Sequence, residues 1–252
     1  YRFRGRESRS LDSVLLQVAV HRGNEIKIDA MEQLFAALFS IKKGGWKQRF
    51  SVQPVISFEI VALPEDIKSY VWTPKKLQDL VEKQIHGAYP DAEISEVPEY
   101  DIFPEKGKVV YQSLQLRKQN YYPLKTYKDL ATDALASLTS ALAKMSPGEA
   151  AAVQLLVSPA NSKWQKEGAS FISETKKRES DPEKAKFSVP AKTLEAVESK
   201  VDKPGFQVAI RIVVVAPQEE KAKMHLKNVA STFAQFSSEL NGLKKRKIRR
   251  KG

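Results

Sequence analysis

The sequence contains no cysteine among its 252 residues, so it can form neither a disulfide nor a thiolate metal site. Its three histidines, His21, His86 and His225, are far apart and follow no metal-ligand spacing. No run of about 18 apolar residues occurs, which predicts no membrane span and no signal peptide within these residues. We therefore expect neither a metal ion nor a cofactor.

The motifs of common catalytic sites are also missing. A phosphate-binding loop needs glycines followed by Lys-Ser or Lys-Thr, and the chain contains no GKS or GKT. It has no GxSxG elbow, no Ser/His/Asp arrangement and no clustered pair of carboxylates. We predict that these residues are not an enzyme, because ATP hydrolysis would require a loop that they lack.

The net charge of +12 is concentrated at the two ends of the sequence. Residues 1–10 carry +3 and residues 243–252, "LKKRKIRRKG", carry +7, which leaves only +2 for the 232 residues between them. A nucleic-acid-binding domain usually has a basic face on the fold itself. The basic flank over residues 1–12 and the basic tail or linker over residues 243–252 are therefore better explained as solvated segments than as dedicated binding sites.

The hydrophobic periodicity of the first hundred residues predicts six elements in the order β-α-β-β-α-β. Asp29 and Glu32 resemble a capping box at the start of the first helix, and Gly44 and Gly45 end it. This element order is that of a ferredoxin-like split βαβ unit, which we assign to residues 13–105.

A second, similar series follows over residues 106–242, with an insertion at residues 160–205 that contains two predicted helices. No fourth strand is evident after the helix that ends near Leu240. Either this strand lies beyond Gly252, or the tail itself pairs, which its like charges disfavour. We therefore predict an α+β fold of two tandem ferredoxin-like units. Each has an antiparallel sheet with helices on one face, and the second contains the helical insertion and has no evident last strand.

The loop over residues 42–50 is the best candidate for a ligand contact in the folded part. Lysines and arginine alternate there with aromatic rings, which can stack on bases while the cations contact phosphates. The alternative is that the rings pack on the first helix and the lysines are solvated. The predicted nucleic-acid residues are Lys42, Lys43, Trp46, Lys47, Arg49, Lys244, Lys245, Arg246, Lys247, Arg249 and Arg250. The aromatic motif of an RNA-recognition sheet is absent.

Four aromatic residues are candidates for a protein-interaction surface. Tyr70 and Trp72 belong to a short apolar strand that we predict at a sheet edge, where a partner strand can dock. Trp164 and Phe171 lie in the first predicted helix of the insertion. The alternative for Trp164 is that it anchors its helix to the core, because tryptophan is largely buried on average.

Four stretches of the sequence together resemble a known family. They are "GNEIKIDAMEQLFAAL" (residues 23–38), "ISFEIVALPEDIKSYVWTPKKLQDLVEKQIHGAYPDAEI" (56–94), "PGEAAAVQLLVSPANSKWQKEG" (147–168) and "IRIVVVAPQEEKAKMHLKNVASTFAQF" (210–236). The most specific pattern is Tyr-x-x-x-Pro from Tyr70, then Gln-Ile, then Tyr-Pro-x-Ala-Glu-Ile ending at Ile94. The sequence resembles the N-terminal region of type IV secretion or conjugative DNA-transfer ATPases of Patescibacteria.

This resemblance implies a membrane segment upstream of Tyr1 and a HerA/FtsK-like P-loop motor domain downstream. It also implies a cytoplasmic location at the inner face of the cell membrane. From it we expect a non-catalytic assembly domain that binds protein partners or itself within a secretion machine, with possible DNA contact through the basic ends. The alternative function is a single-stranded nucleic-acid-binding module that uses the basic-aromatic loop and the tail. The resemblance carries no active-site residues over to this chain.

Overall fold

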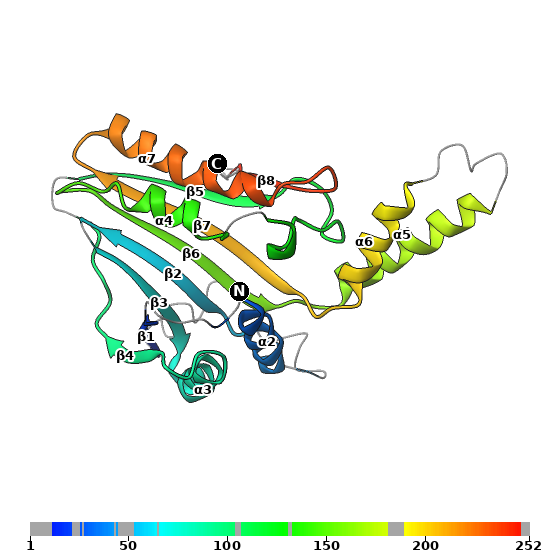
Figure 1. The fold of residues 1–252 in the computed structure, drawn as a ribbon, viewed down its shortest axis with the longest axis horizontal. Coiled ribbons are helices and arrows are strands. Elements are labelled where there is room, and N and C mark those ends of the chain that lie inside the picture. Colours follow the sequence, from blue (N-terminus) through cyan, green and yellow to red (C-terminus); the bar gives the residue numbers. More distant parts are fainter. Residues whose placement is uncertain are drawn as a thin grey trace, which may run out of the picture.

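The computed structural model describes residues 12–21, 26, 28–42, 44, 53–64, 66–103, 107–130, 133–180 and 189–247. Within these residues, eight strands form one antiparallel sheet in the order β4-β1-β3-β2-β6-β7-β5-β8 (Figure 1). The strands are β1 (Ser13–Ala19), β2 (Ile56–Leu63), β3 (Asp66–Pro74), β4 (Glu93–Val97), β5 (Lys108–Leu116), β6 (Ala150–Pro159), β7 (Phe206–Ala216) and β8 (Leu243–Lys245).

The two halves of the chain share this sheet, because β2 pairs with β6 from Ile56↔Val157 to Ala62↔Ala151. The prediction of two tandem ferredoxin-like units is therefore wrong. An unpaired strand leaves a row of backbone donors and acceptors without partners, and pairing β2 with β6 satisfies both rows at once. The result is one continuous sheet.

Helices cover one face of the sheet. They are α2 (Asp29–Leu38), α3 (Gln78–Ala88), α4 (Ala136–Leu142) and α7 (Glu219–Thr232) (Figure 1). Short 3-10 helices extend or connect them at Phe39–Ile41, Lys75–Leu77, Tyr127–Asp129 and Phe233–Phe236. Each helix of this face has an apolar stripe, and its buried side chains face the strands, as expected for amphipathic surface helices.

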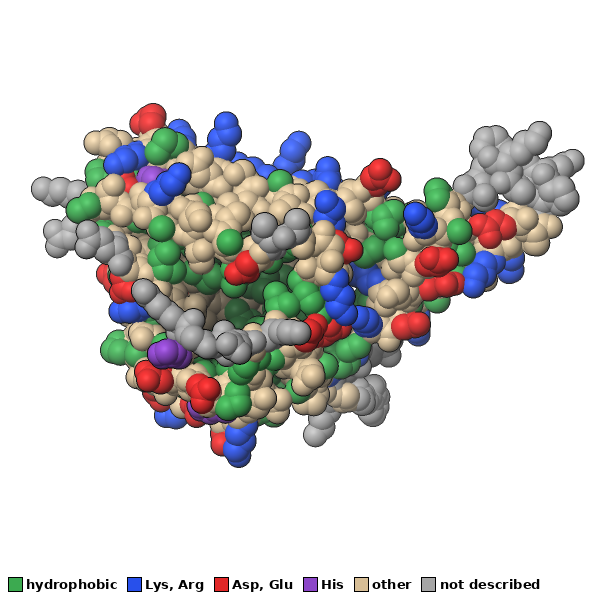
Figure 2. All heavy atoms as spheres, in the orientation of Figure 1, with side chains coloured by type: hydrophobic (Ala, Val, Ile, Leu, Met, Phe, Trp, Pro, Cys, Tyr) green, Lys and Arg blue, Asp and Glu red, His purple; other side chains and the backbone are tan. Residues whose placement is uncertain are grey.

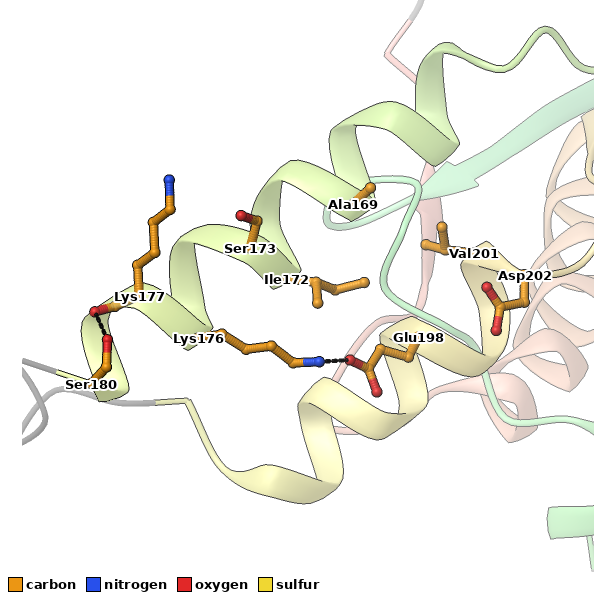
Figure 3. Close-up of a pocket in the computed structure, with 9 residues that line it drawn as sticks. All are labelled: Ala169, Ile172, Ser173, Lys176, Lys177, Ser180, Glu198, Val201 and Asp202. Atoms are coloured by element: carbon orange, nitrogen blue, oxygen red, sulfur yellow. Dashed lines mark hydrogen bonds and ion pairs between the residues drawn. The ribbon is translucent and has the colours of Figure 1, made fainter.

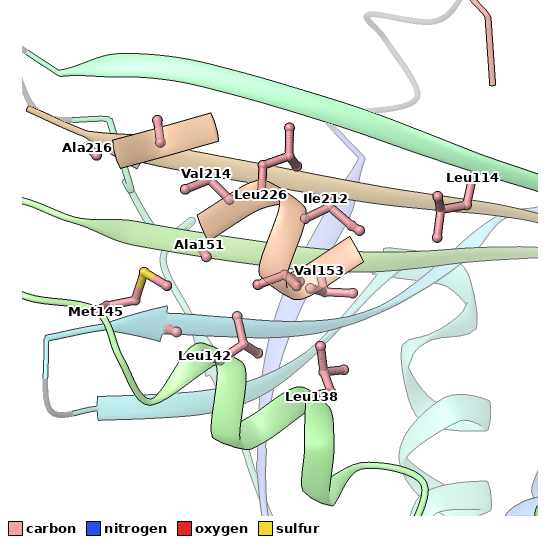
Figure 4. Packing of buried hydrophobic residues seen from close by; sticks show 13 residues of the cluster. Leu114, Leu138, Leu142, Met145, Ala151, Val153, Ile212, Val214, Ala216 and Leu226 are labelled. Atoms are coloured by element: carbon pink, nitrogen blue, oxygen red, sulfur yellow. The ribbon is translucent and has the colours of Figure 1, made fainter. Parts of the chain in front are cut away.

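The core continues across the join between β2 and β6. Alternate residues of β2 point to the helix face, where Ile56 packs in the cluster under α2 and α3, and Ala62 packs in the cluster under α4 and α7. In the second cluster, Leu142 of α4 and Val214 of β7 are fully buried (Figure 4). The two clusters lie on the same face, so β2 belongs to both.

None of the described helices covers the opposite face of the sheet. Instead, the segment after β4 crosses it, and Ile102 is buried in a third cluster with Val61 of β2 and Val215 of β7. The ring of Tyr100 lies 5.2 Å from that of Tyr70, centroid to centroid.

The two edges of the sheet differ in charge. β4 forms one edge and exposes Glu93 and Glu96, whereas the other edge ends with β8, whose exposed lysines are Lys244 and Lys245. Of the two alternatives left open for the missing strand, the structure shows that the tail itself pairs over its first three residues, although its like charges disfavour this. Leu243 packs beside the core on the helix face while the lysines remain solvated, so the strand forms without burying its charges.

Candidate interaction site on the α5–α6 arm

Two helices leave the sheet between β6 and β7 and form a projecting arm (Figure 1). They are α5 (Lys163–Glu179) and α6 (Ala191–Val201). Gly168 lets α5 approach its neighbours closely. A Cβ atom at this position would lie 2.5 Å from Cγ2 of Val201 and 3.0 Å from Cβ of Tyr121.

An aromatic cluster fixes the base of α5. The rings of Phe171 and Tyr121 stack with centroids 5.1 Å apart and an interplanar angle of 23°. Tyr122 completes the cluster at 5.5 Å from Phe171 and 4.8 Å from Tyr121. Aromatic pairs in such geometries contribute about 0.5–1.5 kcal/mol each beyond their buried area. Phe171 therefore anchors the arm to the loop that follows β5.

Lys200 fixes the base of α6. Its ammonium donates hydrogen bonds to the backbone carbonyls of Asn120 and Tyr122, the latter at 3.1 Å, and lies 5.9 Å from the ring centroid of Trp164. Burial lowers the pKa of Lys200 to about 8, because desolvation disfavours the charged form. A half-buried lysine thus holds the same loop as the aromatic cluster.

Asn241 connects that loop to the C-terminal end of the fold. Its side chain is fully buried, and Nδ2 donates to the carbonyls of Gln119 at 3.2 Å and Tyr122 at 3.0 Å. Its Oδ1 accepts from the backbone N–H groups of Lys118 at 3.0 Å and Gly242 at 2.9 Å. All four hydrogen-bonding positions of the amide are used, so Asn241 holds the loop in one conformation.

Trp164 packs at the point where the chain returns to the sheet. A Cβ atom on Gly205 would lie 2.5 Å from Cζ2 of Trp164, so the indole occupies the space that glycine leaves free. Gln165 donates to the carbonyls of Val201 at 2.9 Å and Lys203 at 3.2 Å. Both Trp164 and Phe171 are half-buried. Their contacts with Gly205 and Tyr121 place them at the base of the arm.

A groove of about 720 Å³ runs along one side of the arm (Figure 3). Its lining residues are Ala169, Ile172, Ser173, Lys176, Lys177, Ser180, Glu198, Val201 and Asp202. In Figure 3, Ile172 points from α5 into the space between the helices. Lys176 and Glu198 form an ion pair of 2.7 Å between α5 and α6. The groove therefore combines an apolar floor with charged rims of both signs.

The other predicted protein-contact residues lie elsewhere. β3 is an interior strand between β1 and β2, so the expectation that Tyr70 and Trp72 belong to a free sheet edge is wrong. Tyr70 is 7% exposed and Trp72 is half-buried. Sequence reasoning failed here because a short apolar strand looks the same at an edge and in the interior.

The predicted nucleic-acid residues are divided between distant parts of the sheet. Lys42 follows α2 and lies 5.0 Å from the ring centroid of Phe39. Four others, Lys244, Lys245, Arg246 and Lys247, are exposed at or beyond β8 on the opposite side of the sheet. The remaining predicted residues lie outside the described part of the chain; they are Lys43, Trp46, Lys47, Arg49, Arg249 and Arg250.

Sequence reasoning missed a buried carboxylate at the other end of the sheet. Glu149 has no exposed side-chain surface; it forms an ion pair with Lys221 of α7, and its Oε2 lies 3.0 Å from Nε2 of His225 on the same helix. Burial raises the pKa of Glu149, but Lys221 and the N–H of Ser146 more than offset it and hold that pKa below its usual value. These contacts tie the turn before β6 to α7.

A second polar cluster joins the two halves of the chain. The hydroxyl of Tyr127 donates to Asp29 and lies 3.2 Å from Oε2 of Glu32, and Lys203 forms a 3.0 Å ion pair with Glu32. The carboxylates raise the pKa of Tyr127. The capping box predicted for Asp29 and Glu32 is wrong, because α2 begins without a side-chain cap. Their partner is 95 or more residues away, so no local pattern could reveal it.

A third cluster lies on the face without helices. The hydroxyl of Tyr100 donates to Oε2 of buried Glu59, and Gln154 donates to the same hydroxyl at 3.2 Å. Burial and then the Glu59 carboxylate raise the pKa of Tyr100. The contacts fix the segment after β4 on the sheet.

Two further kinds of feature are absent from the described part of the chain. No group of three or more His, Asp or Glu side chains there is placed to hold a metal ion. None of the described helices is long and apolar enough to span a bilayer.

Residues 6–242 match the family described as "Domain of unknown function (DUF8128)", and the chain belongs to this family. No curated protein matches the sequence. Among solved structures, a glycopeptide hexose oxidase complexed with teicoplanin and an aclacinomycin oxidoreductase are each similar with a TM-score of 0.37 and 12% sequence identity. Each comparison covers 89% of this chain and 41% of the other, so the chain spans less than half the length of those two proteins.

Proposed function

We propose that this chain is a non-catalytic assembly domain whose α5–α6 arm docks another protein of a membrane-associated DNA-transfer or secretion machine. The observation that carries the proposal is the arm itself, which projects from the sheet and has an open groove with an apolar floor. The type of machine follows only from the resemblance of the sequence to the N-terminal region of secretion and DNA-transfer ATPases.

The construction of the arm supports a docking role. At its base, Phe171, Lys200 and Asn241 fix it through stacking and hydrogen bonds to one loop. Further out, the groove places Ile172 beside the ion pair of Lys176 and Glu198. A surface that is held in place before binding loses less conformational entropy on association. The arm therefore suits a partner segment with an apolar anchor flanked by charges of both signs.

Site-specific photo-cross-linking in cells tests this proposal. A photoreactive residue at Ser173, in the groove, is compared with one at Lys192, which is exposed on α6 outside the groove lining. We expect one discrete cross-linked protein from position 173 and none from position 192. Ile172→Glu should abolish the cross-link, while Lys192→Gln, an equal change in charge, should not. Equal cross-linking from both positions would contradict a specific groove.

A second candidate function, single-stranded nucleic-acid binding, is favoured by the basic edge of the sheet. Exposed lysines and arginines gather along α7 and β8 (Figure 2), where Lys245, Arg246 and Lys247 follow one another. Replacing these three by glutamine should reduce the slope of log binding constant against log salt by about 2, since each cation contributes about 0.7 for single strands. An unchanged slope would exclude the edge as the site.

A further inference from the structure

In the described part of the chain, the first residues of β5 have a strand partner on one side only. β8 pairs with β5 only from Leu114 to Leu116, and Arg246 N–H donates to the Ser113 carbonyl at 2.8 Å. On the outer side of residues 108–112, no described strand pairs with β5. Among the described residues, these five residues of β5 therefore have no strand partner on that side.

The exposed side chains of this edge are apolar. Val109 is 49% exposed and Tyr111 is 60% exposed, and both lie on the face of the sheet without helices. An exposed, unpaired and apolar strand is a template for pairing with another chain. Natural proteins usually place a charge at such positions, but between Val109 and Gln112 there is none.

The direction of the free backbone groups follows from the hydrogen bonds to β8. Ser113 accepts from Arg246, and Arg117 donates to Gly242 at 2.8 Å, so both residues direct their backbone groups outward. Orientation alternates along an antiparallel strand, so the outward groups of the free edge are the N–H and C=O of Val109 and Tyr111.

We propose that this edge pairs with the same edge of a second copy of the chain, antiparallel, about a two-fold axis through Val110. In this register Val109 of one copy lies opposite Tyr111 of the other, so two hydrogen-bonded pairs satisfy all the free groups. The same pairs bring an aromatic ring against a β-branched side chain on each strand, a favourable cross-strand combination. Lys108 lies opposite Gln112, so no like charges face each other directly.

Other registers and the other edge fit less well. An axis through Tyr111 would place Val109 opposite Ser113, whose carbonyl already accepts from Arg246. At the opposite edge of the sheet, self-pairing of β4 would gather the exposed carboxylates of Glu93 and Glu96 from two copies. The free part of β5 is therefore the self-complementary edge.

Sedimentation equilibrium over a concentration series, with folding checked by circular dichroism, tests the pairing and its register. Five residues per copy form less than a standard interface of about 1,600 Å², so we expect a weak monomer–dimer equilibrium. Changing Val109 and Tyr111 both to lysine should weaken association at least about tenfold. The oppositely charged variant Val109→Lys/Tyr111→Glu should associate more strongly than the double lysine variant, because the proposed register places each lysine opposite a glutamate.

Two controls separate this pairing from general adhesion. Phe103→Lys changes a residue that is 56% exposed outside the strands, and it should leave association unchanged. Added salt should strengthen association, because each copy carries a net charge of +12. The inference would be overturned if the chain stayed monomeric at every concentration. It would also be overturned if Val109→Lys/Tyr111→Glu weakened association as much as the double lysine variant. Dimers that form only after deletion of residues 248–252 would overturn it too, because the chain's own tail would then occupy the edge.

The inference is independent of the arm. Ile172→Glu should leave the dimer intact, while the double lysine variant should leave cross-linking from the arm intact.

Discussion

Replacing Asn241 by alanine tests whether the loop after β5 holds the arm. The side chain makes four hydrogen bonds to backbone groups of Lys118, Gln119, Tyr122 and Gly242. Asn241→Ala leaves the two N–H donors and the Gln119 carbonyl without this partner. The Tyr122 carbonyl still accepts from the Lys200 ammonium.

The expected cost is the sum of these unsatisfied groups. A buried backbone group that loses its partner costs about 1–3 kcal/mol, but Lys118 and Gln119 are exposed enough for water to reach them. We therefore expect Asn241→Ala to lower the free energy of unfolding by about 3 kcal/mol. Asn241→Asp should cost at least as much, because it directs carboxylate oxygens at the carbonyls that now accept from Nδ2.

Urea unfolding monitored by circular dichroism measures this cost. Asn228→Ala, at an exposed position of α7, is the matched control and should change stability by less than about 0.5 kcal/mol. The tryptophan fluorescence, to which Trp164 contributes along with Trp46 and Trp72, should also change in the Asn241 variant if the base of the arm loosens. A cost below about 1 kcal/mol with unchanged fluorescence would refute the idea that Asn241 fixes the arm.

Three further predictions concern other contacts. Since the pKa of Lys200 is about 8 in the folded chain and about 10.4 when unfolded, the free energy of unfolding should rise with pH above 8. Denaturation at pH 7 to 9.5 should show a rise of about 2 kcal/mol, and Lys200→Met should remove it. Glu149→Gln should cost about 3 kcal/mol at pH 7. Because the folded pKa of Glu149 is lowered, that difference should disappear as pH falls through it in an acid titration. Gly168→Ala should cost about 1–3 kcal/mol through contact with Val201, unlike Gly87→Ala in open space, and Val201→Ala should recover part of the loss in a double-mutant cycle.

Local patterns in the sequence predicted the helices of the arm well. Two helices are predicted within the insertion at residues 160–205, and the structure has α5 at Lys163–Glu179 and α6 at Ala191–Val201. A helix depends mainly on contacts three and four residues apart, so its signal is contained within the element.

The sheet itself could not be predicted from such patterns. The pairing of β2 with β6 joins Ile56 to Val157, and no local signal specifies which strand edges meet. The tail was misjudged for a related reason. Its charges disfavour a buried strand, but β8 needs only Leu243 on the core side and leaves its lysines in solvent.

The candidate site was predicted only in part. Trp164 and Phe171 were identified as interaction residues, but their rings pack on Gly205 and Tyr121 at the arm's base. The groove residue Ile172 stands beside Phe171 in the sequence, and only the helix rotation decides which of the two faces outward. A sequence signal for the groove would require knowing which face of α5 meets α6.

Affinity for the protein captured from the groove tests the central claim most directly. An equilibrium titration should compare the unchanged chain with Ile172→Glu and Lys192→Gln, all shown to be equally stable. The account predicts that Ile172→Glu weakens binding at least about tenfold, which corresponds to about 1.4 kcal/mol, while Lys192→Gln stays close to the unchanged chain. Equal affinity for all three would contradict docking in the groove of the arm.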